Sequence, residues 1–272
     1  MGNRPQQTVR RIGASRMADI PLQTLRLLNA GKLETANLVE WLAIDQGLLL
    51  QKIAPDIGLG RSRDRLNEDW EILRTKGVMA RIRGIGTALD RLTRTWKTRE
   101  AVYERLASHR SDCVREWAAF MDEANPNLSL RQRLRRARRF AIDPHFGVRE
   151  CAWSCVRPHL ADELDLGFRL LMPWVLSDNP LLRRFAIEGT RPRGVWTRHL
   201  KALVAKPAQG LPLLEPCKSD PNRYVQDAVA NWLNDAGKSA PDWVEQVCSR
   251  WSRESRSDAT RYIVRRAQRR QQ

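Results

Sequence analysis

The sequence predicts an all-α protein whose paired helices repeat and stack into a curved solenoid. Apolar residues recur at spacings of three and four, while the alternating β-branched runs typical of strands are absent. From Ser111 onward, an Asp that can cap a helix recurs about every 37 residues. Such a fold needs no disulfide, metal or sheet, because each repeat is buried against its neighbours.

Each predicted repeat begins with an Asp, followed several residues later by a helix that opens with apolar and charged residues. The five units start at Asp112 (then Val-Arg-Glu-Trp-Ala), Asp143 (Val-Arg-Glu-Cys-Ala-Trp), Asp178 (Leu-Arg-Arg-Phe-Ala), Asp220 (Val-Gln-Asp-Ala-Val) and Asp258 (Ile-Val-Arg-Arg-Ala). We interpret these aspartates as helix N-caps and expect companion helices over 129–141, 163–175 and 241–251. A period of this length is typical of HEAT-like repeats, which present one edge of every repeat on a concave surface.

We assign residues 1–95 to an N-terminal helical cap and residues 96–272 to the repeat array, together forming a single domain. Within 34–53 the apolar residues line up as one helical stripe, namely Leu38, Trp41, Leu42, Leu48, Leu49 and Ile53. The run Gly84-Ile85-Gly86-Thr87-Ala88 is similar to the phosphate-binding turn of a helix-hairpin-helix, although a plain helix break is the simpler interpretation.

The charge of the chain indicates a polyanionic partner. With 48 basic against 31 acidic residues, the formal net charge is +17, which favours nucleic acid first and an anionic membrane second. A GC-rich genome can explain why Arg outnumbers Lys, but it does not explain the excess of bases over acids. The chain has no run of 18 apolar residues and no apolar segment behind its basic N-terminus, so we expect no membrane span, no secretory signal, and a cytoplasmic, nucleoid-associated protein of prokaryotic type.

A basic residue recurs early in four of the repeat helices, at Arg115, Arg149, Arg183 and Arg265. Two interpretations are open: these arginines form a track for DNA phosphates, or they solvate helix ends. Their place near helix N-termini, where backbone N–H groups also attract phosphate, favours the track. We therefore expect reversal of Arg149, Arg183 or Arg193 to weaken DNA binding without unfolding the protein.

The five cysteines are odd in number and scattered along the chain. Cys151 and Cys155 lie one helical turn apart, with His145 and His159 nearby. This spacing matches no common zinc pattern, so we interpret the cysteines as buried, reduced thiols and expect no metal. Gly58-Leu59-Gly60 is not followed by Lys-Ser/Thr, so no nucleotide cofactor is expected either.

Two segments can carry chemistry. In 182–193 a helix bears Glu188 in its last turn and ends at Gly189 before an Arg-Pro-Arg loop, and in 224–238 a helix ends with Asp235 just before Gly237. Equivalent ends of neighbouring repeats would place both carboxylates on the same concave edge. Alternatively, Glu188 is the salt-bridge partner of an arginine and Asp235 is a C-terminal cap, which are purely structural roles.

Both segments carry a resemblance to a known family. Leu-Arg-Arg-Phe-Ala-Ile-Glu-Gly-Thr-Arg-Pro-Arg at 182–193, Tyr-Val-Gln-Asp-Ala-Val-Ala-Asn-Trp-Leu-Asn-Asp-Ala-Gly-Lys at 224–238 and Glu-Thr-Ala-Asn-Leu-Val-Glu-Trp-Leu-Ala at 34–43 resemble the HEAT-like-repeat alkylpurine DNA glycosylases, more the AlkC than the AlkD branch. The match is strongest over 178–251. One departure is His145, which stands where an acidic residue is expected.

The resemblance implies catalytic carboxylates at Glu188 and Asp235 and a lesion-pocket wall at Trp196. With the arginine track, it also gives DNA contacts at Arg149, Trp153, Arg183, Arg184, Arg191, Arg193, Asn231, Asn234 and Lys238. N-alkylation makes a base a cationic leaving group, and a buried carboxylate can stabilise the oxocarbenium-like transition state without metal or cofactor. We therefore expect a monomeric, metal-independent glycosylase that removes bases such as 3-methyladenine from duplex DNA in base excision repair. The alternative is a non-catalytic HEAT-repeat module that binds nucleic acid or protein.

Overall fold

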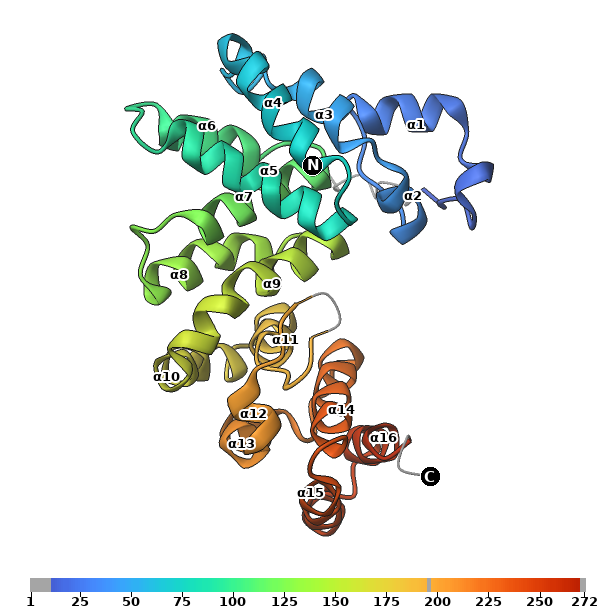
Figure 1. Cartoon of the computed structure of the whole chain (residues 1–272). Coiled ribbons are helices and arrows are strands. Elements are labelled where there is room, and N and C mark those ends of the chain that lie inside the picture. Colours follow the sequence, from blue (N-terminus) through green and yellow to red (C-terminus); the bar gives the residue numbers. More distant parts are fainter. Residues whose placement is uncertain (1–10, 195–196, 270–272) are drawn as a thin grey trace, which may run out of the picture. The chain divides into compact units, whose positions relative to one another are not determined.

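A computed structural model of the chain describes residues 11–194 and 197–269, and every regular element in these ranges is a helix (Figure 1). The all-α prediction is confirmed. The chain divides into two compact units, Met1–Ala124 and Asn125–Gln272. Helix α7 belongs to the first unit, because it packs with helices α5 and α6. The assignment of residues 1–95 to an N-terminal cap within a single domain stays a prediction.

The N-terminal unit contains seven α-helices within the described residues. They are α1 (Leu22–Asn29), α2 (Leu38–Ala43), α3 (Gln46–Ile53), α4 (Arg63–Leu73), α5 (Val78–Thr93), α6 (Arg99–Ala107) and α7 (Asp112–Ala124). The single helical stripe predicted over 34–53 is wrong: Asp45 accepts hydrogen bonds from the N–H groups of Gly47 and Leu48 and so starts a new helix. Leu38 and Leu48 are consequently exposed.

The glycine run at 84–88 lies inside α5, so it is neither a phosphate-binding turn nor a helix break. Its glycines serve helix packing instead. A Cβ atom on Gly86 would lie only 2.5 Å from the Cβ atom of Phe120 on α7, which is closer than real Cβ atoms come. Gly86 is therefore needed because α5 and α7 approach each other closely at this point.

Buried polar contacts hold residues 35–46 against α7. Asp112 accepts hydrogen bonds from the backbone N–H and the hydroxyl of Thr35, at 3.2 and 2.6 Å. The indole N–H of Trp41 donates to the carboxylate of Glu116, with both oxygens at 3.0 Å. All four residues are buried, so these contacts fix the position of α2 within its unit.

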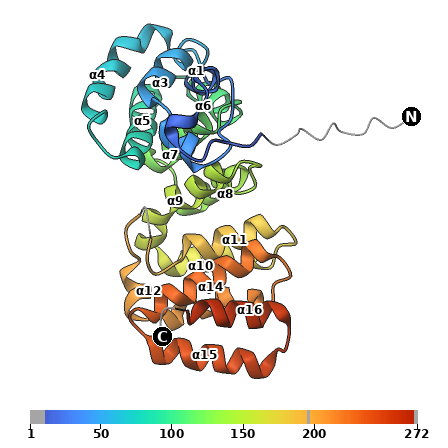
Figure 2. The same cartoon turned by 90° about the vertical axis from the view of Figure 1, so that its right-hand side faces the viewer.

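The second unit contains the remaining repeats. Its elements are α8 (Leu130–Ala141), α9 (Phe146–Asp162), α10 (Leu164–Val175), α11 (Pro180–Gly189), α12 (Lys201–Ala205), η3 (Pro207–Gly210), α13 (Leu211–Leu214), η4 (Glu215–Cys217), α14 (Arg223–Gly237), α15 (Pro241–Glu254) and α16 (Asp258–Ala267). The companion helices α8, α10 and α15 are confirmed where the sequence predicts them. Helix α14 packs between α11 and α16, and these three helices lie side by side in Figure 2.

The N-caps of the repeat helices differ from those predicted. The capping residues are His145 for α9, Asn179 for α11, Asn222 for α14 and Ser257 for α16. Asp143 and Asp220 lie two residues before the cap and each accepts the cap's backbone N–H at 2.8 Å. The aspartates thus mark the helix starts correctly but shape the preceding loop, and the side chain of His145 takes the cap position by accepting from the N–H of Gly147 at 3.2 Å.

The recurring arginines tie each helix to the loop before it. The Nη1 atoms of Arg115, Arg149 and Arg183 each donate to the two carbonyl groups five and six residues earlier, at 2.7–3.0 Å. In α16 the equivalent position belongs to Arg261, which binds the carbonyl of Arg256, and not to the predicted Arg265. These guanidinium groups therefore have a structural role that the sequence pattern alone did not indicate.

Candidate active site

A pocket of about 100 Å³ lies within the second unit. It is lined by residues of α9, α11 and the loop that follows α11, namely Glu150, Trp153, Arg157, Glu188, Arg191, Arg193 and Gly194. The structure thus brings together four residues singled out from the sequence, Trp153, Glu188, Arg191 and Arg193. It adds two that the sequence analysis missed, Glu150 and Arg157.

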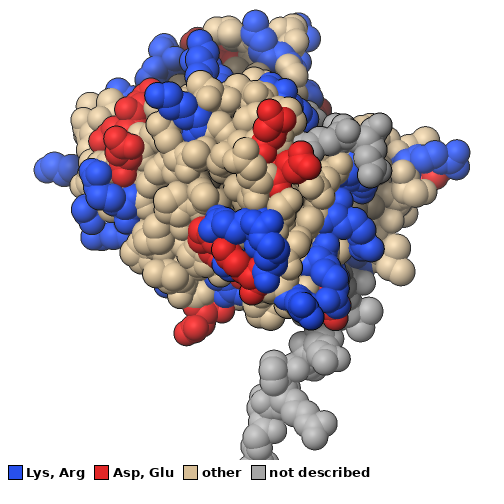
Figure 3. All heavy atoms as spheres, turned by 90° about the horizontal axis from the view of Figure 1, so that it is seen from below, with Lys and Arg blue, Asp and Glu red and all other residues tan. Residues whose placement is uncertain are grey.

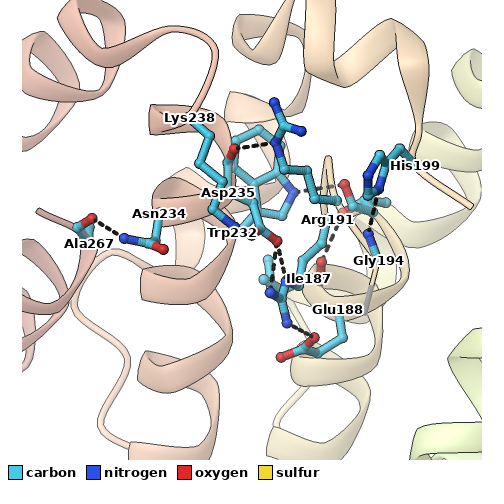
Figure 4. Close-up of polar contacts among 12 residues, drawn as sticks. Ile187, Glu188, Arg191, Gly194, His199, Trp232, Asn234, Asp235, Lys238 and Ala267 are labelled. Carbon is cyan, nitrogen blue, oxygen red and sulfur yellow. Dashed lines mark hydrogen bonds and ion pairs between the residues drawn. The ribbon is translucent and has the colours of Figure 1, made fainter. Parts of the chain in front are cut away.

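Glu188 lies in the last turn of α11 and is only 2% exposed. A carboxylate there is opposed by the helix dipole and by burial. Two arginines compensate for the buried negative charge. The Nη2 atom of Arg184 lies 3.5 Å from Oε1, and the Nη1 atom of Arg191 lies 3.0 Å from Oε2. Figure 4 shows Glu188 and Arg191 in contact at the end of the helix.

Asp235 is also buried, 3% exposed, and lies on α14. Arg191 approaches its Oδ2 atom with Nε at 2.8 Å and Nη2 at 2.7 Å, and Lys238 Nζ lies 3.0 Å from Oδ1. Arg191 therefore bridges Asp235 and Glu188 (Figure 4). Burial by itself would lower the pKa of Arg191, but the charges of Glu188 and Asp235 outweigh burial and raise it.

The two carboxylates do not occupy equivalent repeat positions. Glu188 is the ninth residue after the N-cap of α11, whereas Asp235 is the thirteenth after that of α14, because α14 is longer. The residue of α14 that matches Glu188 is Asn231. Asp235 is not among the pocket-lining residues and reaches the pocket through Arg191.

Glu150 provides a second carboxylate at the pocket. It accepts a hydrogen bond from the indole N–H of Trp153 at 3.2 Å and pairs with Arg184 at 2.8 Å. The guanidinium of Arg184 also lies 3.9 Å from the ring centre of Tyr224, a cation–π contact. Burial opposes the charge of Arg184, but Glu188 and then Glu150 raise its pKa above the ordinary value.

A sequence signal for Glu150 did exist. Glu150 and Arg184 are each the fifth residue after the N-cap of their helices, α9 and α11. In neighbouring repeats such positions lie side by side, so opposite charges in one register predict an ion pair between repeats.

Arg157 holds the loop after α11 in place. It is 1% exposed, and its guanidinium donates to the carbonyl groups of Gly189, Arg191 and Arg198. Burial, followed by the repulsion of Arg191, lowers the pKa of Arg157 to about 10. Since this side chain is one arginine among 40 in the chain, nothing in the pattern identified it.

The other sequence-predicted residues fall into three groups. Arg193 and Lys238 contact Asp235, Arg193 through the backbone carbonyl at 3.3 Å. Asn234 donates to the carbonyl of Ala267 at 3.0 Å and so ties α14 to the end of α16, while Asn231 is half-buried. Trp196 lies outside the described residues, so its predicted place in the pocket wall stays a prediction.

The guanidinium groups of Arg149 and Arg183 bind other groups of the protein. The Arg149 guanidinium lies 5.3 Å from the ring centre of Tyr224, in addition to its two carbonyl contacts. Arg183 binds both carboxylate oxygens of Asp220, at 2.6 and 2.9 Å, and these hydrogen bonds raise its pKa. If either arginine binds a DNA phosphate, its guanidinium must do so while it keeps these contacts within the protein.

Charged side chains are not spread evenly over the face seen in Figure 3. On the face seen from below in Figure 3, Lys and Arg side chains gather in groups, some beside Asp or Glu, around a broad uncharged area. Around the pocket, acidic and basic groups alternate along the series Glu150, Arg184, Glu188, Arg191, Asp235, Lys238. The pocket lining thus combines the carboxylates of Glu150 and Glu188 with the guanidinium groups of Arg157, Arg191 and Arg193.

The described residues contain no group of three or more His, Cys, Asp or Glu side chains that could hold a metal ion. Cys151 and Cys155 are both buried, and the Cys155 thiol donates to the carbonyl of Ala152 at 3.1 Å. Nor is any helix within 11–194 and 197–269 long and apolar enough to cross a membrane.

Comparisons with known proteins identify a family and two structures of similar fold. The model of the family described as "DNA alkylation repair enzyme" matches residues 129–270. The fold is similar to that of the Pseudomonas fluorescens alkylpurine DNA glycosylase AlkC bound to DNA containing an abasic site analog, with a TM-score of 0.66 and 23% identity over 81% of this chain and 61% of that one. It is also similar to smu.31 from Streptococcus mutans UA159, with a TM-score of 0.52 and 17% identity over 81% and 96% of the two chains.

One curated relative is similar in sequence. The Bacillus subtilis (strain 168) protein described as "uncharacterized protein YhaZ" is 38% identical over 96 residues, 35% of this chain and 27% of the relative. The chain thus spans less than two thirds of both this relative and AlkC. Because the family model covers more than half of the chain and includes every residue of the pocket, the protein belongs to the DNA alkylation repair enzyme family.

Proposed function

We propose that the protein is a DNA glycosylase that excises cationic N-alkylated bases, such as 3-methyladenine, from duplex DNA in base excision repair. The observation that carries the proposal is the buried carboxylate of Glu188, which faces a pocket walled by Trp153 in a protein of net charge +17. Family membership and the AlkC-like fold support it. In this proposal the protein acts as a monomer, on nucleoid DNA in the cytoplasm.

The chemistry requires negative charge where positive charge develops. An N-alkylated base is already cationic and leaves without a strong general acid, while the sugar acquires oxocarbenium character that a carboxylate stabilises. Glu188 supplies this carboxylate, and Arg184 and Arg191 hold its two oxygens in fixed directions before the substrate arrives. Preorganisation of this kind avoids the cost of reorienting the group during the reaction.

The remaining groups have supporting roles. The indole of Trp153 offers an aromatic face to a cationic base, and its N–H is held by Glu150. Asp235 acts through Arg191, because its carboxylate binds two guanidinium nitrogens and so fixes the position of that arginine. Glu150, the second carboxylate in the pocket, can orient the attacking water. Arg193 lines the pocket, where its guanidinium can contact a phosphate beside the lesion.

The competing hypothesis is a binding module in which these ion pairs are only structural. Glu188 and Asp235 are indeed partners of Arg191, as that hypothesis requires. In a pure DNA binder, however, Glu150, Glu188 and Asp235 would serve only as ion-pair partners, because a carboxylate does not attract phosphate. The glycosylase proposal gives these charges a purpose.

The decisive test of activity is base release. Purified protein is incubated with a duplex treated with a methylating agent, and the free bases are separated by chromatography. We expect 3-methyladenine or another N-methylated base to appear together with an equal number of abasic sites. Tight DNA binding with no base released from duplexes carrying several alkylated bases would favour the binding module.

A further inference from the structure

A second and larger cavity lies elsewhere in the same unit. Its volume is about 550 Å³, and it is formed where the end of α9 and the start of α10 meet residues 198–202. Its lining residues are Ala161, Leu164, Arg198, His199, Leu200, Lys201 and Ala202. None of them was singled out from the sequence, and the proposed glycosylase chemistry uses none of them.

The lining combines basic side chains with an apolar surface. Arg198, His199 and Lys201 are exposed, whereas Leu200 is buried. The lining contains no carboxylate. Among the residues that the structure describes, neither Arg198 nor Lys201 forms an ion pair, so their charges are not neutralised, in contrast to the arginines around Glu188. Unneutralised cations beside an apolar surface suit a ligand with a phosphate and an adjoining sugar or base.

One loop forms part of both cavities. The carbonyl of Pro192 accepts from the N–H of Leu200 at 2.9 Å, so these two residues lie next to each other. Nδ1 of His199 accepts from the backbone N–H of Gly194 at 3.3 Å (Figure 4). Gly194 lines the first pocket and His199 the second, so this hydrogen bond joins a residue of one cavity to a residue of the other.

Arg157 connects the second cavity to helix α11. It donates to the carbonyl groups of Gly189, the last residue of α11, and of Arg198, at 3.1 and 3.0 Å. These two hydrogen bonds hold Arg198 close to the end of the helix whose Glu188 lines the first pocket. A DNA strand held at one cavity would be positioned relative to the other.

We propose that the second cavity binds the backbone phosphate and sugar of a neighbouring nucleotide in the strand that carries the lesion. This inference rests on the proposed function, since it takes the first pocket as the place where the damaged nucleotide reacts. Arg198 and Lys201 neutralise the phosphate, and Leu164 and Leu200 contact the sugar. The site reads no sequence, because phosphate and sugar are the same in every nucleotide.

The test reverses the two unneutralised charges. The variant Arg198→Glu/Lys201→Glu is compared with Arg135→Glu/Arg138→Glu, which makes the same charge change at two exposed arginines of α8. Binding of an undamaged duplex is measured by fluorescence anisotropy at several salt concentrations. We expect the first variant to reduce the slope of log K against log salt by about 0.9 for each phosphate that it no longer neutralises, and the α8 variant to leave the slope near that of the wild type. Equal slopes for the two variants would overturn the proposal.

Two further arms separate the possible sources of phosphate and the two proposals. Deoxyadenosine 5′-monophosphate is titrated against both variants and the wild type, and the melting temperature is measured. The strand-binding site would be contradicted if this nucleotide raised the melting temperature of the wild type while Arg198→Glu/Lys201→Glu left duplex binding unchanged. Base release is measured separately on methylated duplex. If the wild type releases no base, the proposed function fails, while the salt slopes still decide whether the cavity binds DNA.

Discussion

Arg191, in the loop after α11, binds Asp235 on α14 with two of its guanidinium nitrogens, at 2.8 and 2.7 Å. The same side chain holds Glu188 at 3.0 Å. One arginine therefore forms ion pairs with two buried carboxylates that come from different repeats. These ion pairs consequently tie the end of α11 to α14.

Replacing Arg191 with Met is expected to lower the free energy of unfolding by about 3–5 kcal/mol, because it leaves two buried carboxylates with fewer partners. Urea unfolding measures this loss. The matched control is Arg266→Met, which removes a half-exposed pair with Asp227 and should cost about 1 kcal/mol or less. Equal losses in the two variants would show that Arg191 does not hold the site together.

Arg183 and Arg193 are expected to respond differently to substitution. Arg183→Met removes two hydrogen bonds to Asp220 and two to carbonyl groups, so it should destabilise the fold by about 3 kcal/mol. This revises the expectation that reversing Arg183 leaves the fold intact. Arg193→Met should change stability little and weaken DNA binding. Melting curves and anisotropy together test this order, and an unstable Arg193 variant beside an intact Arg183 variant would refute it.

Trp153 should matter to excision beyond its contribution to the core. Trp153→Leu and Trp174→Leu both remove a buried indole, of which only Trp153 lines the pocket. We expect both variants to lose stability. Only Trp153→Leu should lose about 5- to 30-fold in excision rate per folded molecule, which corresponds to the free energy of one desolvated cation–π contact. Single-turnover excision at a temperature where both variants are folded measures the difference. A similar loss of excision rate for Trp174→Leu would show that Trp153 has no specific role in the pocket.

Stability should fall at alkaline pH because two buried thiols resist ionisation. Burial raises the pKa of Cys217 to about 12 and that of Cys248 to about 11. Both values exceed that of an unfolded thiol, near 9. The stabilisation is therefore complete below pH 9 and is lost as the pH rises towards 11–12. Between pH 8 and 10 the wild type should lose about 1 kcal/mol per thiol more than Cys217→Ala/Cys248→Ala in urea unfolding, and parallel losses would contradict this.

The sequence predicted the architecture better than the details of the site. Helical periodicity and the recurring Asp located α8, α10, α15 and the repeat helices, since burial of one helix face leaves a pattern in sequence. It did not locate the caps, because Asn179 and Asn222 can cap as well as the neighbouring aspartates do. Nor did it show that Arg149 and Arg183 bind carbonyl groups, which a charge pattern does not distinguish from phosphate contact.

The site itself was predictable only in part. Glu188, Arg191 and Arg193 all come from segment 182–193, and the fold brings Trp153 of α9 beside them, whereas Asp235 of segment 224–238 does not line the pocket. Arg157 could not be identified, because its role depends on three carbonyl groups brought together by the fold of the loop. The different registers of Glu188 and Asp235 were already present in the sequence, since Glu188 comes 10 residues after Asp178 and Asp235 comes 15 residues after Asp220.

The central claim is that Glu188 stabilises a positive charge on the sugar, and single-turnover excision by Glu188→Gln tests it most directly. The variant keeps the shape of the side chain and removes its charge; Glu245→Gln, at an exposed position of α15 outside both cavities, is the control. On a defined methylated duplex we predict excision about 100- to 1000-fold slower than the wild type, with DNA binding equal or tighter and a folded protein by melting temperature. Asp235→Asn should follow in the same direction. Excision at the wild-type rate by folded Glu188→Gln would contradict the account and leave this carboxylate a purely structural partner of Arg184 and Arg191.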